Sequence, residues 1–155
     1  LEYVRGANLA IEETQDVELL YNLQKQTLAR QGIEISDTEK RLIFSISKGA
    51  LEKGFGRLTL CKVDGVPASA YLILFDNKRG YALLNGNDPE YRASGSGTKI
   101  TLENMFYIKN EKRLGGYDFL GCNSPARGDY KAGFNIQLLQ HFRTNYKAED
   151  LQGRS

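Results

Sequence analysis

The sequence predicts a mixed α/β fold in which an antiparallel meander leads into a β-α-β unit. Two alternating segments, 57–63 and 66–75, lie on either side of Asp64-Gly65. That dipeptide is a strong two-residue hairpin signal, because both turn positions need a positive φ. After a further turn, a third strand is predicted at 81–85. These three strands form the meander.

The β-α-β unit is predicted by a helix that connects strand 81–85 to a short strand at 117–121. The helix spans about 97–113 and is followed by Gly115-Gly116. Because such crossovers are right-handed, the short strand is expected to lie parallel to strand 81–85. The helix face expected to pack on the sheet comprises Thr101, Leu102, Met105, Phe106 and Ile108.

A short strand at 9–14 and two helices are predicted before the meander. The first helix starts at a Thr14 or Asp16 cap and stops at Gly32. The second starts at a capping box, in which Ser36 and Glu39 each satisfy a free backbone N–H, and ends near 54. Its expected buried stripe comprises Leu42, Ile43, Ile46 and Ala50.

After strand 117–121, the segment 123–133 reads as a loop or a short helix. Alternation over 134–146 predicts a long last strand. The 155 residues suit one domain over 1–155, with a core at about 9–146. No Pro, Gly or low-complexity linker divides the chain.

Composition excludes several classes of protein. The formal charge of +2 is too mild for a nucleic-acid or membrane surface, and no apolar run approaches a membrane span. Two cysteines, Cys61 and Cys122, leave one disulfide open but form no framework, which favours a cytoplasmic location. With His141 as the single histidine, no metal site is expected.

The turn 92–97, Arg-Ala-Ser-Gly-Ser-Gly, lies between a predicted strand and a predicted helix. A pyrophosphate needs inward-pointing backbone N–H groups, close approach and the positive end of a helix dipole. Glycines at 95 and 97 would allow that approach. The candidate binding residues are Arg92, Ser94, Gly95, Ser96, Gly97 and Thr98.

Two other phosphate motifs do not fit this turn. A dinucleotide fingerprint requires glycine where Ile100 stands, and a P-loop requires Lys before Ser or Thr, whereas the order is Thr98-Lys99. The remaining alternative is a turn that only caps a helix.

R-x-x-G-x-G between a strand and the main helix resembles the acyl-CoA signature of the GCN5-related N-acetyltransferase (GNAT) superfamily. The wider pattern, over 81–97, 117–121 and 129–134, looks like its FemAB-like or BioF2-like branch, and 27–32 is similar to the first helix of that branch. The likeness covers about residues 9 to 146. Members often carry two such domains in tandem, so the resemblance leaves open a protein twice as long.

The resemblance implies a mechanism. The strands at 81–85 and 117–121 would be parallel but splayed, with the pantetheine arm of acetyl-CoA or another acyl-CoA between them. A backbone N–H near Leu84 or Asn85 would polarise the thioester carbonyl. An amine, carried by a small molecule or a peptide, would then attack without a covalent enzyme intermediate.

The resemblance points to Lys131, in Tyr-Lys-x-x-Phe, as the first catalytic candidate, for oxyanion stabilisation or for holding the acceptor. Tyr130 or Tyr91 would donate a proton to the thiolate, and Asp118 would serve as base. For each of these side chains, the alternative to a catalytic role is a structural role in packing or hydrogen bonding, or an exposed position on the surface. Further polar candidates read more readily as structural: Glu103, Cys122 and His141.

Three functions remain in view. The leading one is an N-acyltransferase acting from acyl-CoA on an amine. The second is a FemAB-type aminoacyl transferase acting on a cell-wall precursor, which alone would involve tRNA. The third is a non-catalytic domain that binds acyl-CoA or a protein. The resemblance also leaves open a homodimer or a separate N-terminal domain that completes the site.

Overall fold

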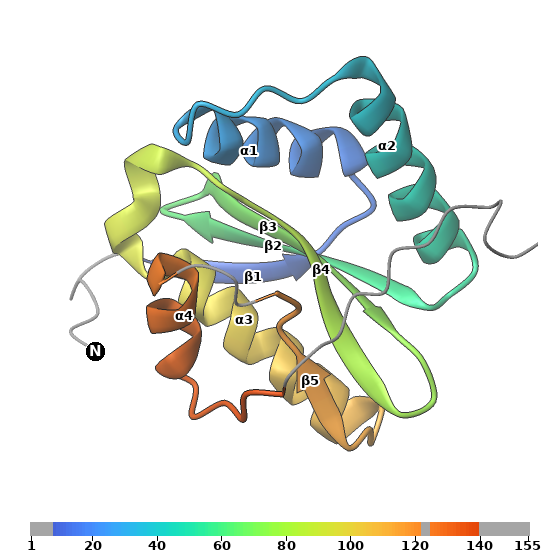
Figure 1. The fold of residues 1–155 in the computed structure, drawn as a ribbon. Coiled ribbons are helices and arrows are strands. Elements are labelled where there is room, and N and C mark those ends of the chain that lie inside the picture. The colour runs from blue at the N-terminus through green and yellow to red at the C-terminus, as the bar shows by residue number, and fades with distance from the viewer. Residues whose placement is uncertain (1–7, 122–124, 140–155) are drawn as a thin grey trace, which may run out of the picture. The chain divides into compact units, whose positions relative to one another are not determined.

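The computed structural model describes residues 8–121 and 125–139, in two compact units, Leu1–Gly121 and Cys122–Ser155. The first unit carries the sheet and three of the helices, and the second carries α4 (Figure 1). The elements are β1 (Leu9–Glu13), α1 (Val17–Ala29), α2 (Asp37–Glu52), β2 (Gly56–Val63), β3 (Val66–Phe75), β4 (Arg79–Asn87), a 3₁₀ helix (Pro89–Ser94), α3 (Ser96–Phe106), a π-helical turn (Tyr107–Glu111), β5 (Gly116–Asp118) and α4 (Pro125–Ala132).

The sheet has five strands in the order β1-β2-β3-β4-β5. The first four are antiparallel neighbours, while β5 pairs with β4 in parallel. The predicted α/β class, the meander and the parallel β-α-β unit are therefore confirmed. The hairpin between β2 and β3 has positive φ at both Asp64 (50°) and Gly65 (86°), as its sequence predicts.

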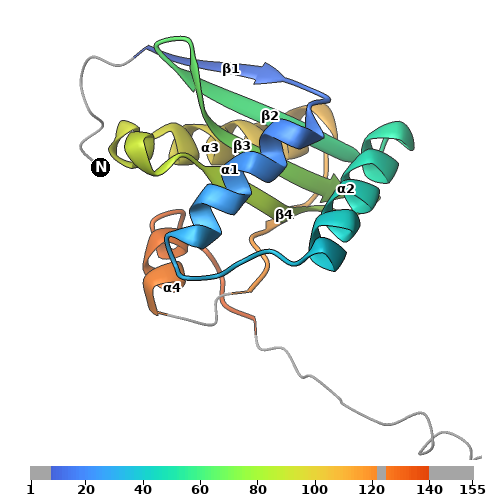
Figure 2. The same cartoon turned by 90° about the horizontal axis from the view of Figure 1, so that it is seen from above.

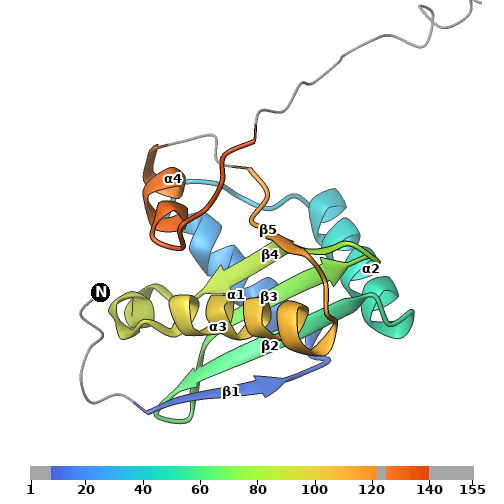
Figure 3. The same cartoon turned by 90° about the horizontal axis from the view of Figure 1, so that it is seen from below.

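Helices cover both faces of this sheet, α1 and α2 on one and α3 on the other (Figures 2 and 3). Alternation along the strands sends successive side chains to opposite faces. On the α1/α2 face, an apolar core forms from Val17, Leu20, Leu23, Leu58, Leu60, Ala70 and Leu72. We call this cluster the apolar core.

The α3 face is different, because polar side chains are buried on it. Arg57 of β2 is buried; its Nε lies 3.1 Å from a Glu13 carboxylate oxygen and its guanidinium lies 4.0 Å from the Tyr107 ring centroid. The Asn104 Oδ1 accepts hydrogen bonds from Arg57 (3.3 Å) and from the Thr59 hydroxyl (2.8 Å). We call these five residues the Arg57 network.

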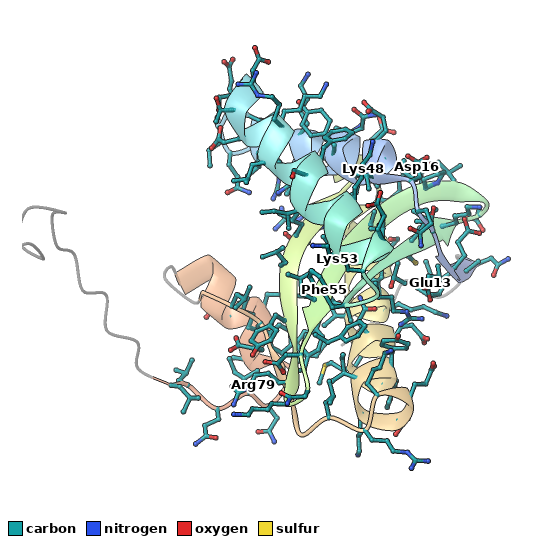
Figure 4. The ribbon with its side chains drawn as sticks, turned by 90° about the vertical axis from the view of Figure 1, so that its right-hand side faces the viewer. Glu13, Asp16, Lys48, Lys53, Phe55 and Arg79 are labelled. Carbon is teal, nitrogen blue, oxygen red and sulfur yellow. The ribbon has the colours of Figure 1, made fainter. Side chains whose placement is uncertain are left out.

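The helix starts follow their capping signals. The Asp16 carboxylate accepts from the Leu19 N–H at the start of α1, and the Ser36–Glu39 capping box is present in full. Figure 4 shows Lys48 on the C-terminal half of α2, Lys53 directly after the end of that helix, and Phe55 just before β2.

Two predicted helix faces are only partly right: Ala50, Thr101 and Ile108 are buried as predicted, but other members of each face are not. On α2, Leu42 is 56% exposed and Ile46 is exposed, whereas Ser47 and Ala50 are buried and Phe44 and Leu51 pack on the apolar core. On α3, Phe106 is 57% exposed, and the buried face comprises Ser96, Ile100, Thr101 and Asn104, with Ile108 in the π-helical turn. In both helices, small or polar residues such as Ser47 and Asn104 take some of the buried positions, alongside apolar ones.

The segment after β5 also differs in part. The predicted loop or short helix at 123–133 contains α4. The predicted long strand 134–146 is wrong for 134–139, which form a turn and irregular backbone; residues 140–146, including His141, lie outside the described residues, as does Cys122. In the part of the chain that the structure describes, no helix is long and apolar enough to cross a membrane.

Candidate active site at the end of β4

The β4 strand has a long open edge. Its parallel pairing with β5 covers only Arg79–Tyr81, although β4 continues to Asn87. Over the described residues, the second half of β4 therefore has a strand on its β3 side and none on its β5 side (Figure 3). An open edge presents backbone N–H and C=O groups that can pair with an extended ligand.

A bulge lies where the open edge begins. In the β3–β4 pairing, Leu72 faces Leu84 and Ile73 faces Ala82, so Leu83 is an extra residue on β4. A bulge increases local twist and leaves its extra residue outside the ladder. Leu84 and the exposed Asn85, the two residues predicted to polarise a thioester, directly follow it.

The turn after β4 has the form of an anion site. Asp88 caps the 3₁₀ helix through the Glu90 N–H, and Gly95 then takes a left-handed conformation (φ 79°) before α3 begins at Ser96. The Ser94 hydroxyl accepts from the Ser96 N–H at 3.2 Å. In α3 the first-turn N–H groups of Gly97 and Thr98 have no acceptor one turn earlier in the helix, and they lie at the positive end of its dipole.

Beneath this turn lies a polar cluster that the sequence did not reveal: Ser69, Tyr71, Asn87 and Ser96. The Asn87 Oδ1 accepts from the Ser69 hydroxyl (2.8 Å) and from the Tyr71 hydroxyl (3.3 Å). The Ser69 and Ser96 hydroxyls lie 2.7 Å apart and share a hydrogen bond. We call these residues the sheet–turn cluster, because they join β3 and β4 to the first turn of α3.

Gly97 also has a structural role that its sequence context does not show. A Cβ there would lie 2.8 Å from the Tyr71 hydroxyl and 3.0 Å from the Asn87 Oδ1. The missing side chain therefore lets α3 approach the sheet, and no steric need on the ligand side is required to explain it. Gly95, with its positive φ, is the glycine that the turn conformation itself requires.

The remaining predicted residues of the turn are placed around it. Arg92 is exposed on the 3₁₀ helix. Ser94 and Thr98 are half-buried, and the Ser94 hydroxyl already caps the helix start.

Asp118 has local partners. Its Oδ1 accepts from the Leu120 N–H at 2.8 Å, and its Oδ2 lies 3.9 Å from Arg79, at the start of β4 (Figure 4). These contacts hold the backbone that directly follows β5. Tyr130 and Lys131 belong to α4 in the second unit, where the Tyr130 and Phe134 rings meet edge to face at 5.3 Å.

Cys61 lies under α3 with Tyr71 and Ile100 and is a free thiol. Burial raises the pKa of the Cys61 thiol, and the positive charge of Lys99 opposes this only in part. A neutral, buried thiol is a poor nucleophile. Among the described residues, no group of His, Cys, Asp and Glu is placed to hold a metal ion.

An open strand edge that runs into a helix N-terminus is an arrangement suited to an extended ligand with an anionic end. The particular family follows from a match of the family model for the acetyltransferase (GNAT) domain to residues 3–132. The chain belongs to this family, whose members use acetyl-CoA as acyl donor. No curated protein matches it.

Solved structures share the fold at low sequence identity. A predicted acetyltransferase with acetyl-CoA from Clostridium acetobutylicum is 16% identical, with a TM-score of 0.69 over 91% of this chain and 96% of that chain. An aminoglycoside acetyltransferase from an uncultured soil metagenomic sample, in complex with sisomicin, is 17% identical, with a TM-score of 0.63 over 90% of this chain and 97% of that chain. Glucosamine-6-phosphate N-acetyltransferase from Arabidopsis thaliana is 12% identical, with a TM-score of 0.63 over 90% of this chain and 98% of that chain.

Proposed function

We propose that this protein transfers an acyl group, acetyl in the simplest case, from acyl-CoA to an amine. The observation that carries the proposal is the open, bulged edge of β4, which ends at the N-terminal turn of α3. One ligand with an extended amide-containing arm and a pyrophosphate at its end fits both features. The family supports the same assignment.

In the proposed reaction, the N–H groups at Gly97 and Thr98 hold the pyrophosphate, and the β4 edge pairs with the pantetheine arm. A backbone N–H at Leu84 or Asn85 donates to the thioester carbonyl oxygen, where negative charge develops. The amine nitrogen attacks the carbonyl carbon, the C–N bond forms and the C–S bond breaks. The nitrogen loses a proton to a base, and the leaving thiolate takes one up.

The groups that move these protons are proposed from the FemAB-like resemblance. Lys131 would hold the acceptor or stabilise the oxyanion, Tyr130 would protonate the thiolate, and Asp118 would serve as base. The contacts of Asp118 with Leu120 and Arg79 favour a structural role instead, so Lys131 is the first residue to test. Lys131→Ala is expected to lower kcat while the KM for acyl-CoA changes little.

The acceptor is proposed to be a small molecule or a peptide that presents a primary amine. Two structural neighbours are named as acetyltransferases of an aminoglycoside and of glucosamine-6-phosphate, which supports a small-molecule acceptor. Aminoglycosides, amino sugars and short peptides therefore make up the first acceptor panel.

Ligand binding is tested with melting curves in the presence of CoA, ATP and NAD. Saturating CoA is expected to stabilise the fold by about 2.7 kcal/mol at ~100 dissociation constants, whereas ATP and NAD should have little effect. Release of free thiol from acetyl-CoA across the acceptor panel then tests turnover. Stabilisation by NAD or ATP but not CoA would overturn the assignment, and binding of CoA without turnover would favour a non-catalytic domain.

A further inference from the structure

Asn87, the last residue of β4, is held in place through three of its polar groups. Its Oδ1 accepts from the Ser69 and Tyr71 hydroxyls. Its backbone N–H donates to the Thr27 hydroxyl oxygen at 2.8 Å. The single proton of that hydroxyl is shared between the carbonyl oxygens of Asn87 and Leu23, each at 2.9 Å. These bonds fix both the backbone and the plane of the side-chain amide, since one end of that amide is pinned from two sides.

The fourth polar group, Nδ2, makes no hydrogen bond within residues 8–121 and 125–139. Asn87 is half-buried, and its Nδ2 is not among the fully buried polar atoms without a partner in this part of the chain. An amide nitrogen carries two N–H donors. Because the oxygen of the same amide is fixed against Ser69 and Tyr71, these donors have a set direction rather than a free rotor.

The side-chain amide of Asn87 lies beside the start of α3. The Oδ1 of the same amide lies 3.0 Å from where a Gly97 Cβ would stand, so the side chain lies against the second residue of the helix. The first-turn N–H groups and the dipole favour an anion at that end. A fixed neutral donor beside them adds a contact to the anion without the entropy loss of ordering a long cationic side chain.

We propose that the Asn87 side-chain amide donates a hydrogen bond to a phosphate oxygen of the acyl-CoA pyrophosphate, which makes Asn87 a binding residue of the donor site. The inference rests on the proposed function and extends it. Ser69, Tyr71 and Thr27 act as positioning residues, because they hold the amide with Nδ2 free.

The test is Asn87→Asp, which keeps an oxygen for Ser69 and Tyr71 but replaces the donor with an anionic oxygen. We expect the Kd of acetyl-CoA to rise about 10–100-fold, the range for a lost hydrogen bond to a charged group. The Kd of acetyl-pantetheine, which has no phosphate, should stay within about twofold, because the change acts only on the phosphate end. The control is Asn110→Asp, which adds the same charge at an exposed position in the π-helical turn and should leave both constants unchanged.

The wild type is measured first, so that failure to bind acetyl-CoA is recognised as failure of the proposed function. An unchanged Kd of acetyl-CoA in Asn87→Asp, or an equal loss for both ligands, would overturn the inference. If the variant does not fold, the side-chain amide NMR signal of Asn87 in the wild type decides. It is expected to shift with acetyl-CoA and not with acetyl-pantetheine, and no difference between the two would overturn the inference as well.

Discussion

The two faces of the sheet are built from different chemistry. On the α1/α2 face, the apolar core joins leucines of α1, β2 and β3, and Leu20, Leu58 and Leu72 are fully buried. On the α3 face, hydrogen-bonded polar groups form the Arg57 network and the sheet–turn cluster. Burial of apolar area is non-directional, whereas hydrogen bonds fix distances and angles.

This difference indicates that the two faces have different roles, one in stability and the other in positioning the turn before α3. Leucines can stabilise the fold without specifying the position of any one atom to a fraction of an ångström. The sheet–turn cluster instead ties the first turn of α3 to β3 and β4, so the N–H groups proposed to bind pyrophosphate keep a fixed distance from the β4 edge. Variants on the α1/α2 face should therefore affect stability most, and variants around the turn should affect ligand binding most.

The largest expected effect is on stability, from Leu58→Ala in the apolar core. Leu58 is fully buried, so truncation loses its transfer free energy and leaves a cavity, at a cost of about 2–5 kcal/mol in the free energy of unfolding. Denaturant titration measures the loss, and a CoA titration of the folded variant should give a nearly unchanged Kd. A large change in that Kd would break the proposed division between the faces.

Arg57→Met is expected to cost less, about 1–3 kcal/mol. The change removes the hydrogen bond to Asn104 and the ion pair with Glu13, but Glu13 remains half-exposed and solvated, unlike a carboxylate in a fully buried pair. Denaturant titration measures the cost. Lys62→Met is the matched control on the same strand, since Lys62 pairs with Glu12 at 2.8 Å on the surface, and it should cost under about 1 kcal/mol. Equal costs for the two variants would show that burial of Arg57 contributes nothing.

Gly97→Ala and Gly80→Ala form a second matched pair. Each new Cβ would overpack the contact between the sheet and the helical segment that starts with α3, against Tyr71 at residue 97 and against Ile108 at residue 80. Both variants should lose about 1–3 kcal/mol of stability. Only Gly97→Ala shifts the proposed anion site, so its Kd for CoA should rise about tenfold while that of Gly80→Ala stays near wild type. A Kd that rises equally in both would contradict a specific role for the sheet–turn cluster.

Much of the fold could be predicted because its signals are local. The Asp64-Gly65 dipeptide specifies its own turn conformation, and the Ser36–Glu39 capping box needs only four residues to form. The 3₁₀ helix after β4 has such a signal too, in the Asp88 cap followed by Pro89.

The features missed depend on partners distant in the chain. Nothing near Asn104 in the sequence shows that Arg57 and Thr59 will bond to it, so the larger apolar Phe106 looked like the better core residue. Ser69 and Tyr71 likewise alternate with apolar residues on β3, a pattern that usually marks a solvated face. Here α3 covers that face, and the Ser69 and Tyr71 hydroxyls both donate to the Asn87 Oδ1.

The smallest expected effect on the free energy of unfolding comes from Cys61. It tests whether water reaches the face of the sheet that α3 covers. The folded state keeps this thiol neutral by raising its pKa, whereas the unfolded thiol ionises near its ordinary pKa of about 8.5. The unfolded state therefore binds fewer protons than the folded state as the pH rises. The contribution of Cys61 to stability is complete below about pH 7.5 and declines from about pH 8.5 towards the raised pKa.

Cys61→Ala lacks this titration. The difference in unfolding free energy between the wild type and Cys61→Ala, measured by denaturant titration at several pH values, should be constant up to about pH 7.5 and shift against the wild type above it. A difference that stays flat to about pH 10 would mean that the thiol ionises freely in the folded protein, and that water reaches the sheet beneath α3.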